Sequence, residues 1–478
     1  MTLRVYDTCR RAKLPFEKKP GDRVGIYTCG MTVQDKPHVG HMRSSISGDV
    51  IRRWLEERGY VVTYVYNFTD IDDKIIAKAQ DEGVGYENVS RRNEQAYLDY
   101  ALRLQIKPAT HYPRATEHIG EIHALIQKLI DRGHAYAAGG DVYFDVRSFS
   151  TYGQLSGHNV DDLRSGSRIE VGESKKDPLD FTLWKGAKPG EPSWPSPWGP
   201  GRPGWHIECS AMAMKYLGET LDMHGGGRDL IFPHHENELA QSEAATGRPF
   251  VRFWMHNGLL YTGGQKMSKS LGNFFLMEDI LKKFSPDEVR FYLLSTHFRS
   301  QAEFSETRLE EARAGFARLR DGARRLQEAR AAAGPTSPVV SEAGMELRAV
   351  LARVRAGSMD AMAHDFNTAG ALGKLFELMR ELNRFLDGWA PGRDAAVLHE
   401  VGDGLQELLQ LLGFFPAGLP AEEEGAVPAE VVHLAAERQA ARQARDWARA
   451  DVLRKEIQTH GFVVEDRADG FRLKPLVS

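Results

Sequence analysis

The first part of the chain alternates between segments with a strand pattern and a segment with a helix pattern. Residues 23–28 form a short apolar run typical of a buried strand, and residues 60–66 are β-branched and aromatic, which also predicts a strand. Residues 40–58 between them repeat apolar side chains at helical spacing, and Gly59 ends that pattern. The apolar face of this helix carries Ile46, Val50, Trp54 and Leu55. A strand, a helix and a strand of these lengths predict a βαβ unit, from which parallel sheets are built.

A second series of elements with the same character follows later in the chain. The pattern predicts a helix over residues 205–214, a strand over 221–224, the start of a helix at 232–239 and a strand over 252–261. Residues 225–229 predict a glycine turn that lets a ligand approach the backbone, with Asp229 placed to accept a ribose hydroxyl. Parallel sheets bind ligands beyond the carboxyl ends of their strands. We therefore expect one crevice surrounded by Cys29, Gly30, Thr32, His38 and His41.

Changes in composition along the chain predict its domains. We expect an α/β fold in which residues 1–302 form a Rossmann-type parallel-sheet catalytic domain, interrupted by an insertion over roughly 110–204. Residues 149–204 within the insertion are rich in Gly, Pro, Ser and Trp, which predicts a long irregular segment. Residues 303–420 repeat apolar side chains at helical spacing and predict a helical bundle. A linker rich in Gly, Pro and Glu then precedes a small C-terminal α+β segment over 426–478.

Composition and charge narrow the classes of function. The chain has 478 residues, of which 42% are hydrophobic and 27% charged, as in a soluble globular enzyme. It has neither a signal-peptide pattern at its start nor a run near the ~20 apolar residues that span a membrane. Three cysteines are too few for a disulfide framework and favour a reducing, cytoplasmic location. A net charge of −4 creates no overall field for nucleic acid, so any RNA contact depends on a local basic patch.

Cys29, Cys209, His234 and Glu238 are candidate metal ligands. His234 and Glu238 are four residues apart and share one face of a helix, while Cys29 and Cys209 belong to the two halves of the predicted sheet. Thiolate, imidazole and carboxylate groups suit Zn²⁺. From spacing alone, Cys209 as a core residue and His234 as a capped helix start are the better explanations. A protease site is not expected, since no second histidine follows at zincin spacing.

Asp70, Asp72 and Asp73 form an acidic cluster after the second predicted strand. Three carboxylates in four residues could bind Mg²⁺. Aspartate is also favoured in the first turn of a helix, where it accepts hydrogen bonds from backbone N–H groups. We prefer this capping interpretation.

Two short motifs, one early and one late, carry side chains suited to a nucleotide. Residues 37–41 read Pro-His-Val-Gly-His, which places His38 and His41 at a predicted helix start. Residues 265–273 carry Lys266 and Lys269, whose ammonium groups can neutralise a triphosphate. Alone, the second motif is better explained as a solvated basic loop. In this order, the two motifs resemble the paired nucleotide-binding signatures of class I aminoacyl-tRNA synthetases.

Within that class the chain resembles the cysteinyl-tRNA synthetase family over nearly its whole length. The motifs that carry the resemblance are residues 29–33, 37–41, 67–74, 201–210, 225–238 and 266–270. The resemblance implies one zinc ion per chain that binds the thiolate of the substrate. Its implied ligands are Cys29, Cys209, His234 and Glu238. The implied amino-acid pocket contains Cys29, Gly30, Thr32 and Trp205.

The reaction that the resemblance implies has two steps. L-cysteine reacts with ATP, accompanied by Mg²⁺, to give cysteinyl-adenylate and pyrophosphate, and the cysteinyl group then passes to the terminal adenosine of tRNA(Cys). The implied catalytic side chains are His38, His41, Lys266 and Lys269. The implied ATP and adenylate contacts are Gly40, His41, Gly227, Asp229 and Lys269. No heptad seam is evident in the sequence, which favours a monomer.

The C-terminal segment carries basic side chains at helical spacing beside an aromatic ring. They are Arg438, Arg442, Arg445, Trp447 and Arg449. Such a stripe can hold a single-stranded RNA loop, and a solvated helix face explains it equally well. The resemblance assigns this region, with a hairpin predicted around residues 468–470, to anticodon recognition.

Two other functions are compatible with parts of the pattern. A zinc-dependent ligase that joins cysteine to an amino sugar, as in mycothiol synthesis, would share the metal and nucleotide motifs but lack the basic C-terminal segment. A non-catalytic RNA-binding paralogue would have lost His41, Lys269 or a metal ligand, and this sequence retains all of them.

Overall fold

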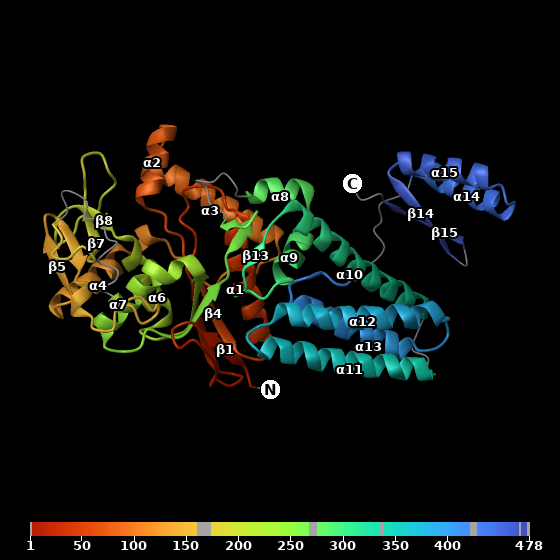
Figure 1. The fold of residues 1–478 in the computed structure, drawn as a ribbon, viewed down its shortest axis with the longest axis horizontal. Helices are drawn as coiled ribbons and strands as arrows, with labels where there is room; N and C mark the ends of the chain where they lie inside the picture. The colour runs from red at the N-terminus through yellow and green to blue at the C-terminus, as the bar shows by residue number, and fades with distance from the viewer. Residues whose placement is uncertain are drawn as a thin grey trace. The chain divides into compact units, whose positions relative to one another are not determined.

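A computed structural model of the chain describes residues 2–159, 174–266, 275–333, 339–420, 428–467 and 470–475. The chain divides into two compact units, residues 1–420 and 421–478, which are described separately (Figure 1). No helix in the described ranges is long and apolar enough to cross a membrane.

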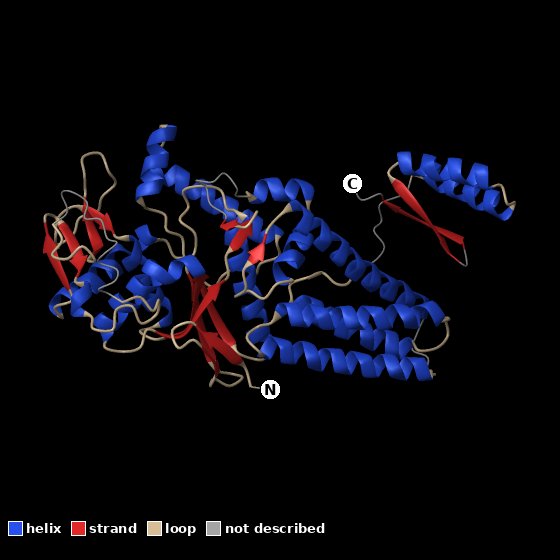
Figure 2. Cartoon of the chain, viewed as in Figure 1, coloured by secondary structure: helices blue, strands red, loops and turns tan. Residues whose placement is uncertain are grey.

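A parallel sheet of four strands in the order β10-β9-β3-β4 forms the centre of the first unit (Figure 2). The strands are β3 (Arg23–Thr28), β4 (Val61–Tyr66), β9 (Leu221–Gly227) and β10 (Val251–Asn257). Helix α1 (Val39–Glu57) connects β3 to β4, and α6 (Trp205–Leu217) precedes β9. The predicted α/β fold is therefore confirmed, and the carboxyl ends of these strands meet at one edge of the sheet.

The glycine run after residue 224 belongs to β9 and is not the predicted turn. Residues 225–227 pair in parallel with residues 255–257 of β10. A side chain at Gly226 would lie 2.8 Å from the His235 ring, which explains why glycine is needed there. The pairing partner lies about 30 residues further along the chain, where a local pattern does not reveal it.

The strand predicted over residues 252–261 is divided at Gly258. A side chain there would lie 2.1 Å from the carbonyl oxygen of Ser300, so the two backbones cross in direct contact. Beyond this crossing, β11 (Leu260–Thr262) leaves the central sheet and pairs with β12 (Gln265–Lys266) and β13 (Ala302–Glu303). The contact at Gly258 thus redirects the chain into a second, smaller sheet.

The segment between β4 and α6 is more regular than its composition predicts. It contains α2 (Asp73–Glu82), α3 (Tyr86–Arg103), α4 (Ile119–Asp131), β5 (Ala135–Ala138), β6 (Asp141–Phe144), β7 (Phe181–Gly186) and β8 (Gly201–Pro203). The last four form an antiparallel sheet in the order β5-β6-β7-β8. Residues 149–204, predicted to be irregular, therefore contribute two strands. Trp184 of β7 is fully buried, so this aromatic side chain belongs to a core and not to a loop.

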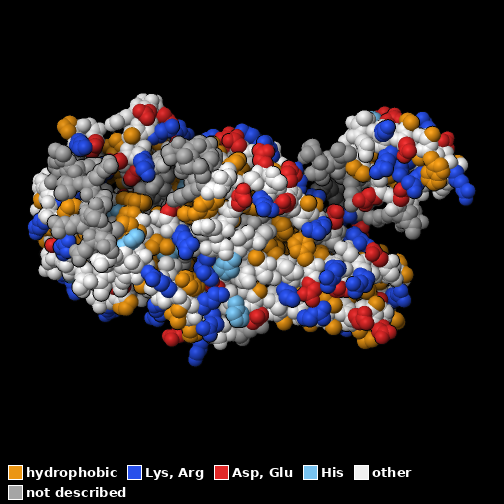
Figure 3. Space-filling model, viewed as in Figure 1, with side chains coloured by type: hydrophobic (Ala, Val, Ile, Leu, Met, Phe, Trp, Pro, Cys, Tyr) orange, Lys and Arg blue, Asp and Glu red, His pale blue; other side chains and the backbone are white. Residues whose placement is uncertain are grey.

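A hairpin and a series of helices complete the first unit. They are β1 (Arg4–Asp7), β2 (Ala12–Pro15), α7 (Glu236–Thr246), α8 (Met277–Lys283), α9 (Pro286–Leu294), α10 (Glu306–Ala333), α11 (Glu342–Ala363), α12 (Thr368–Gly388) and α13 (Ala395–Leu411). The last four pack as a bundle whose apolar side chains continue the core of the sheet. On the face drawn in Figure 3, acidic and basic side chains alternate over the bundle, in agreement with the low net charge.

The second unit is small and has its own core. It contains α14 (Ala429–Gln443), α15 (Trp447–Thr459) and the antiparallel hairpin β14 (Phe462–Arg467) and β15 (Gly470–Pro475). Its core consists of Val431, Ala435, Ile457 and Val464. The predicted C-terminal hairpin is thus confirmed, with longer strands than predicted.

Candidate active site

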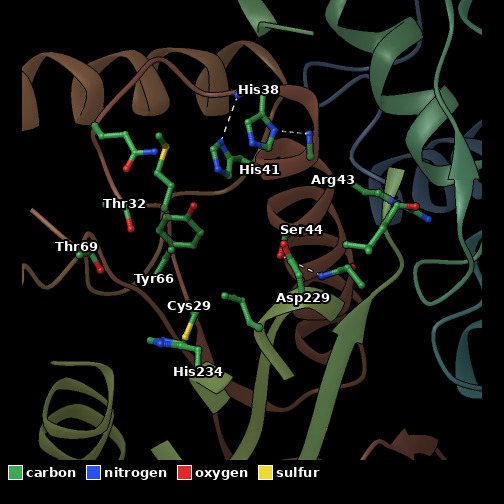
Figure 4. A pocket seen from close by; sticks show the side chains of 18 of the residues that line it. Cys29, Thr32, His38, His41, Arg43, Ser44, Tyr66, Thr69, Asp229 and His234 are labelled. Carbon is green, nitrogen blue, oxygen red and sulfur yellow. Dashed lines mark hydrogen bonds between the residues drawn. The ribbon is translucent and has the colours of Figure 1, made fainter. Parts of the chain in front are cut away.

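A cavity of about 380 Å³ lies at the carboxyl ends of β3 and β9, beside the first turn of α1 (Figure 4). Its lining includes most of the residues singled out in the sequence: Cys29, Gly30, Thr32, His38, Gly40, His41, Trp205, Cys209, Gly227, Asp229 and His234. Glu238 does not line the cavity and is buried in contact with Cys29 and His234. The fold therefore assembles in one place residues that are more than 200 positions apart in the sequence, such as Cys29 and Glu238.

The two histidines of residues 37–41 cap the start of α1. Nδ1 of His38 accepts a hydrogen bond from the backbone N–H of Gly40 at 3.1 Å, and Nδ1 of His41 accepts one from the backbone N–H of His38 at 3.3 Å. The two rings stack with their centroids 3.7 Å apart. A side chain at Gly40 would lie 2.9 Å from the His38 ring, so glycine makes room for that ring.

Burial keeps both of these histidines neutral. It lowers the pKa of His38 to about 4 and the pKa of His41 well below its ordinary value. Because Nδ1 of each ring accepts a backbone hydrogen bond, the proton of each neutral imidazole lies on Nε2. The pair therefore supplies neutral hydrogen-bond donors at the positive end of the α1 dipole, not two cations.

Four buried side chains from separate segments meet at one side of the cavity. Cys29 follows β3, Cys209 lies on α6, His234 lies in the π-helical turn Ile231–His235, and Glu238 lies on α7. Cys29 Sγ is 3.6 Å from Cys209 Sγ and 3.3 Å from Glu238 Oε1. His234 Nε2 is 3.0 Å from the same carboxylate oxygen. The set hypothesised from the sequence is thus brought together by the fold.

Mutual contacts set the charges of this cluster. Burial alone would lower the pKa of His234, but the Glu238 carboxylate and hydrogen bonds to Cys209 and Glu238 raise it to about 10. Burial opposes ionisation of Glu238, yet the imidazoles of His224 and His234 hold its pKa well below the ordinary value. The hydrogen bond with Cys29 lowers the pKa of Cys209 to about 6. These pKa directions favour a carboxylate at Glu238 and a thiolate at Cys209, the deprotonated forms that metal ions bind, whereas burial raises the pKa of the Cys29 thiol and His234 holds a proton.

A second group of potential metal ligands shares two residues with the first. Cys29 and Glu238 also lie beside His224 and His235, and the ligand atoms of these four residues lie within 4.8 Å of one another. His224 Nε2 is 2.8 Å from Glu238 Oε2, and His235 Nε2 is 3.3 Å from Cys29 Sγ. Neither of these histidines lines the cavity. The sequence pattern alone indicates no role for either histidine, and the adjacent pair His234 and His235 is its one local signal.

Close backbone contacts shape the cavity around this cluster. A side chain at Gly30 would lie 1.6 Å from the carbonyl oxygen of Asn67, so only glycine fits, and the Gly30 N–H donates to Asn67 Oδ1 at 2.9 Å. Thr32 forms a parallel bridge with Thr69. Trp205, at the first position of α6, stacks on His234 with the ring centroids 4.4 Å apart.

The structure describes most of the residues predicted to contact the nucleotide. Asp229 lies in the 3-10 turn Arg228–Leu230, directly after β9. A side chain at Gly227 would lie 2.4 Å from the Asp229 carboxylate, so the turn folds back closely on the strand. Lys266 is the last residue of β12, and its backbone is paired with Tyr261 of β11. Lys269 lies outside the described residues.

One residue of the acidic cluster at 70–73 has the predicted capping role, and the other two aspartates have different partners. Asp72 is the N-cap of α2 and accepts a hydrogen bond from the backbone N–H of Lys74 at 2.9 Å. Asp73 forms ion pairs with Lys185 and Arg202. Asp70 accepts hydrogen bonds from the backbone and the hydroxyl of Thr116. These carboxylates are engaged separately, and none of them belongs to a metal-ligand cluster among the described residues.

The basic stripe predicted in the C-terminal segment does not follow one helix. Helix α14 ends at Gln443, and Arg445 adopts a left-handed backbone with φ 58° before α15 begins at Trp447. Arg438 is 4% exposed and ion-paired with Asp466. Helical spacing across residues 438–449 was therefore a false signal, because the chain turns in its middle.

The other predicted side chains of this segment are Arg442, Trp447 and Arg449, and the first two are in contact. Arg442 also pairs with Asp466 and lies over the ring of Trp447, at 5.8 Å from its centroid. Trp447 is 59% exposed. Arg449, on α15, pairs with Glu437 of α14.

Comparison with known proteins identifies the class to which this site belongs. The sequence profile of the "tRNA synthetases class I (C) catalytic domain" matches residues 15–314, a DALR domain matches 358–416, and the "Cysteinyl-tRNA ligase anticodon binding domain" matches 424–472. A solved structure of Mycobacterium tuberculosis methionyl-tRNA synthetase with methionyl-adenylate covers 82% of this chain and 91% of its own, with a TM-score of 0.62 and 16% identity. The enzyme is a class I aminoacyl-tRNA synthetase in fold and in catalytic domain.

Full-length relatives define the family within that class. The cysteine–tRNA ligase of Heliobacterium modesticaldum is 48% identical over 99% of this chain and 100% of its own length. That of Pseudomonas paraeruginosa is 49% identical over 98% of both. The chain belongs to the cysteine–tRNA ligase family.

Proposed function

We propose that this enzyme activates L-cysteine with ATP to form cysteinyl-adenylate and pyrophosphate, and then transfers the cysteinyl group to the terminal adenosine of tRNA(Cys). The observation that carries the proposal is the arrangement of one cavity. The stacked pair His38 and His41 lies at one end of it, and Cys29 and His234 lie at the other (Figure 4). A nucleotide phosphate suits the first end, and a sulfur-containing substrate suits the second.

The cluster at the second end fits a zinc ion held by Cys29, Cys209, His234 and Glu238. Ligand atoms at ~2.0–2.3 Å from one tetrahedral ion lie roughly 3.3–3.8 Å apart. The contacts between the cysteine sulfurs and between Cys29 and Glu238, at 3.6 and 3.3 Å, agree with this spacing, and the His234–Glu238 contact at 3.0 Å is slightly shorter. Three of these side chains line the cavity, whereas His224 and His235 do not, which favours this set over the alternative.

A bound zinc ion would supply a soft Lewis acid that takes the substrate side chain as a thiolate and so favours cysteine over serine. Selection by a metal–thiolate bond is needed because the shape of a pocket separates the binding free energies of close analogues by only ~1–3 kcal/mol. The protein supplies the rest of the pocket. Trp205 packs on His234 and holds that imidazole in place, while Gly30 and Thr32 form the wall that faces a small amino acid.

The other end of the cavity supports attack of the cysteine carboxylate on the α-phosphorus of ATP. The Nε2–H groups of His38 and His41 donate hydrogen bonds to phosphate oxygens as charge develops, and the N-terminus of α1 adds to this effect. Gly40 and Gly227 let the nucleotide approach the backbone, and the Asp229 carboxylate accepts a hydrogen bond from a ribose hydroxyl. Lys266 and Lys269 hold the leaving pyrophosphate, and ATP carries Mg²⁺.

We assign tRNA binding to residues 426–478, after a catalytic domain over 1–302 and a helical bundle over 303–420. The exposed Trp447 and the Arg442 guanidinium over its ring support this assignment, because an aromatic ring with a guanidinium group suits an unpaired base, and Arg449 on the same helix as Trp447 adds a further positive charge. Arg438 is buried, so it supports this surface through Asp466 and does not contact RNA itself.

An assay of products tests this proposal. The enzyme should show cysteine-dependent exchange of pyrophosphate into ATP and should attach cysteine to tRNA(Cys). Attachment of cysteine to an amino sugar, with no charging of tRNA, would overturn it. The match of residues 424–472 to an anticodon-binding domain disfavours that alternative.

A further inference from the structure

We propose that Arg43 is a positioning residue for the nucleotide end of the cavity, because it joins the helix that carries His38 and His41 to the opposite wall at residues 258–260. The proposal rests on the proposed function, since it concerns adenylation. Arg43 lies on α1, two residues after His41, and lines the same cavity.

The guanidinium of Arg43 binds two backbone segments at once. One terminal nitrogen donates to the carbonyl oxygens of Gly258 at 2.8 Å and Leu259 at 3.3 Å, and the other donates to that of Ser300 at 2.6 Å. Figure 4 shows the side chain turned away from the two histidines. Arg43 therefore fixes the point where the chain leaves β10 and crosses the segment that leads to β13.

The Arg43 guanidinium is a buried cation without a carboxylate partner, which indicates that its contacts with the backbone carbonyls serve to hold the two segments in place. Arg43 is 2% exposed, and the partners of its guanidinium among the described residues are carbonyl oxygens, not a carboxylate. Burial lowers its pKa to about 10. Burying a charge is costly, and a planar guanidinium can bridge two backbone segments with its two terminal nitrogens, whereas a lysine ammonium offers a single nitrogen.

The two segments held by Arg43 pack too tightly to be positioned independently. The backbone N–H of Gly258 donates to the carbonyl oxygen of Phe298 at 2.8 Å, and that of Ala302 donates to Leu259 at 3.2 Å. Asn257 adds a second link to α1 through a 3.0 Å hydrogen bond to Ser44. A shift at the crossing would thus move both segments relative to α1.

The first turn of α1 holds the chain at a later point as well. The backbone N–H of Val39 donates to the carbonyl oxygen of Phe275 at 3.2 Å, and the N–H of Met277 donates to that of Pro37 at 3.2 Å. The start of α1 is therefore the common anchor of residues 257–259 and residues 275–277. Among these attachments, the Arg43 contacts and the Asn257–Ser44 hydrogen bond are made by side chains, so a substitution can remove them while leaving the backbone unchanged.

The expected effect follows from geometry and not from direct contact with the reacting atoms. A nucleotide placed between His41 and Leu260 depends on the spacing of these two walls. A displacement of about 1 Å in a reacting geometry costs on the order of 100-fold in rate. Cysteine binding at the other end of the cavity involves no residue that Arg43 contacts.

The test compares Arg43→Lys and Arg43→Met with a matched control, Arg290→Lys. Arg290 is also a fully buried arginine, and it donates to the carbonyls of Leu104 and Leu412 and pairs with Asp49, outside the cavity. Pyrophosphate exchange gives kcat/KM for ATP and the KM for cysteine. Amide hydrogen exchange reports the protection of residues 258–262 in the same samples.

We expect both Arg43 variants to lower kcat/KM for ATP by about 10- to 100-fold, to leave the KM for cysteine within about twofold, and to speed hydrogen exchange at 258–262. The Arg290 variant should lower thermal stability and keep its kinetics. Unchanged kinetics in a folded Arg43 variant, or an equal loss in the control, would overturn the proposal. If Arg43→Met does not fold, Arg43→Lys decides. A wild-type enzyme without cysteine-dependent exchange would instead refute the proposed function, and hydrogen exchange would still test the Arg43 contacts.

Discussion

Replacing His38 separately by asparagine and by alanine distinguishes the two tasks that its imidazole performs. Nδ1 caps α1 by accepting the N–H of Gly40, and we propose that Nε2–H donates to the substrate phosphate. Asparagine retains an acceptor for the helix cap but places no donor at the position of Nε2, whereas alanine retains neither. The pair of variants therefore measures the two contributions one at a time.

The magnitudes follow from these two hydrogen bonds. Loss of an N-cap acceptor costs ~0.5–2 kcal/mol of stability, so His38→Ala should be destabilised by about 1 kcal/mol and His38→Asn by little. Loss of a donor to transition-state charge costs ~2.7–4 kcal/mol, which is about 10²–10³-fold in rate. Both variants should show this loss, because neither places a donor at the position of Nε2. The ring is neutral in the folded protein, so the substitution removes a hydrogen bond and no net charge.

Urea unfolding and cysteine-dependent pyrophosphate exchange measure these effects, and hydrogen exchange at the Gly40 amide reports the cap directly. Near-normal exchange activity in His38→Asn would show that Nε2 does not act on the phosphate. Equal destabilisation of the two variants would show that the cap does not depend on the Nδ1 acceptor.

Two further substitutions and one deletion test the metal site, the lysine loop and the C-terminal segment. Cys209→Ser should lose most of its zinc, measured by elemental analysis, and become less selective against serine, measured by serine-dependent pyrophosphate exchange. The control Cys9→Ser lies outside the cluster and should change neither quantity. Lys269→Ala should lower the exchange rate by about 10²–10³-fold in a folded protein, and a wild-type rate would refute its role. Deletion of residues 426–478 should leave exchange nearly intact and reduce the charging of tRNA sharply, whereas undiminished charging would show that this segment does not bind tRNA.

The elements that depend on local pattern were predictable from the sequence. Helix α1 and strands β3 and β4 were recognised because their apolar spacing and the stop at Gly59 are local signals. The extension of β9 through residues 225–227 was not, because the pairing with β10 that makes these glycines a strand comes from a distant segment. The break at Gly258 likewise depends on Ser300, which passes beside it only in the folded chain.

The metal cluster illustrates the same limit for the site. Cys29 and Cys209 are separated by 180 residues, so spacing could suggest them only together with the resemblance to a family. His224 and His235 were missed because each looks like an ordinary residue of a strand or a helix start. Helical spacing predicts Arg445 and Arg449 on the same helix as the arginines before them, because spacing does not reveal the left-handed backbone at Arg445 between α14 and α15.

X-ray absorption at the zinc edge tests the central claim most directly. The ligand set Cys29, Cys209, His234 and Glu238 predicts a zinc site with two sulfur ligands in the free enzyme. Addition of L-cysteine should increase the sulfur count to three, and addition of L-serine should leave it unchanged. A protein active without zinc, or a zinc site whose sulfur count does not change with cysteine, would contradict the account.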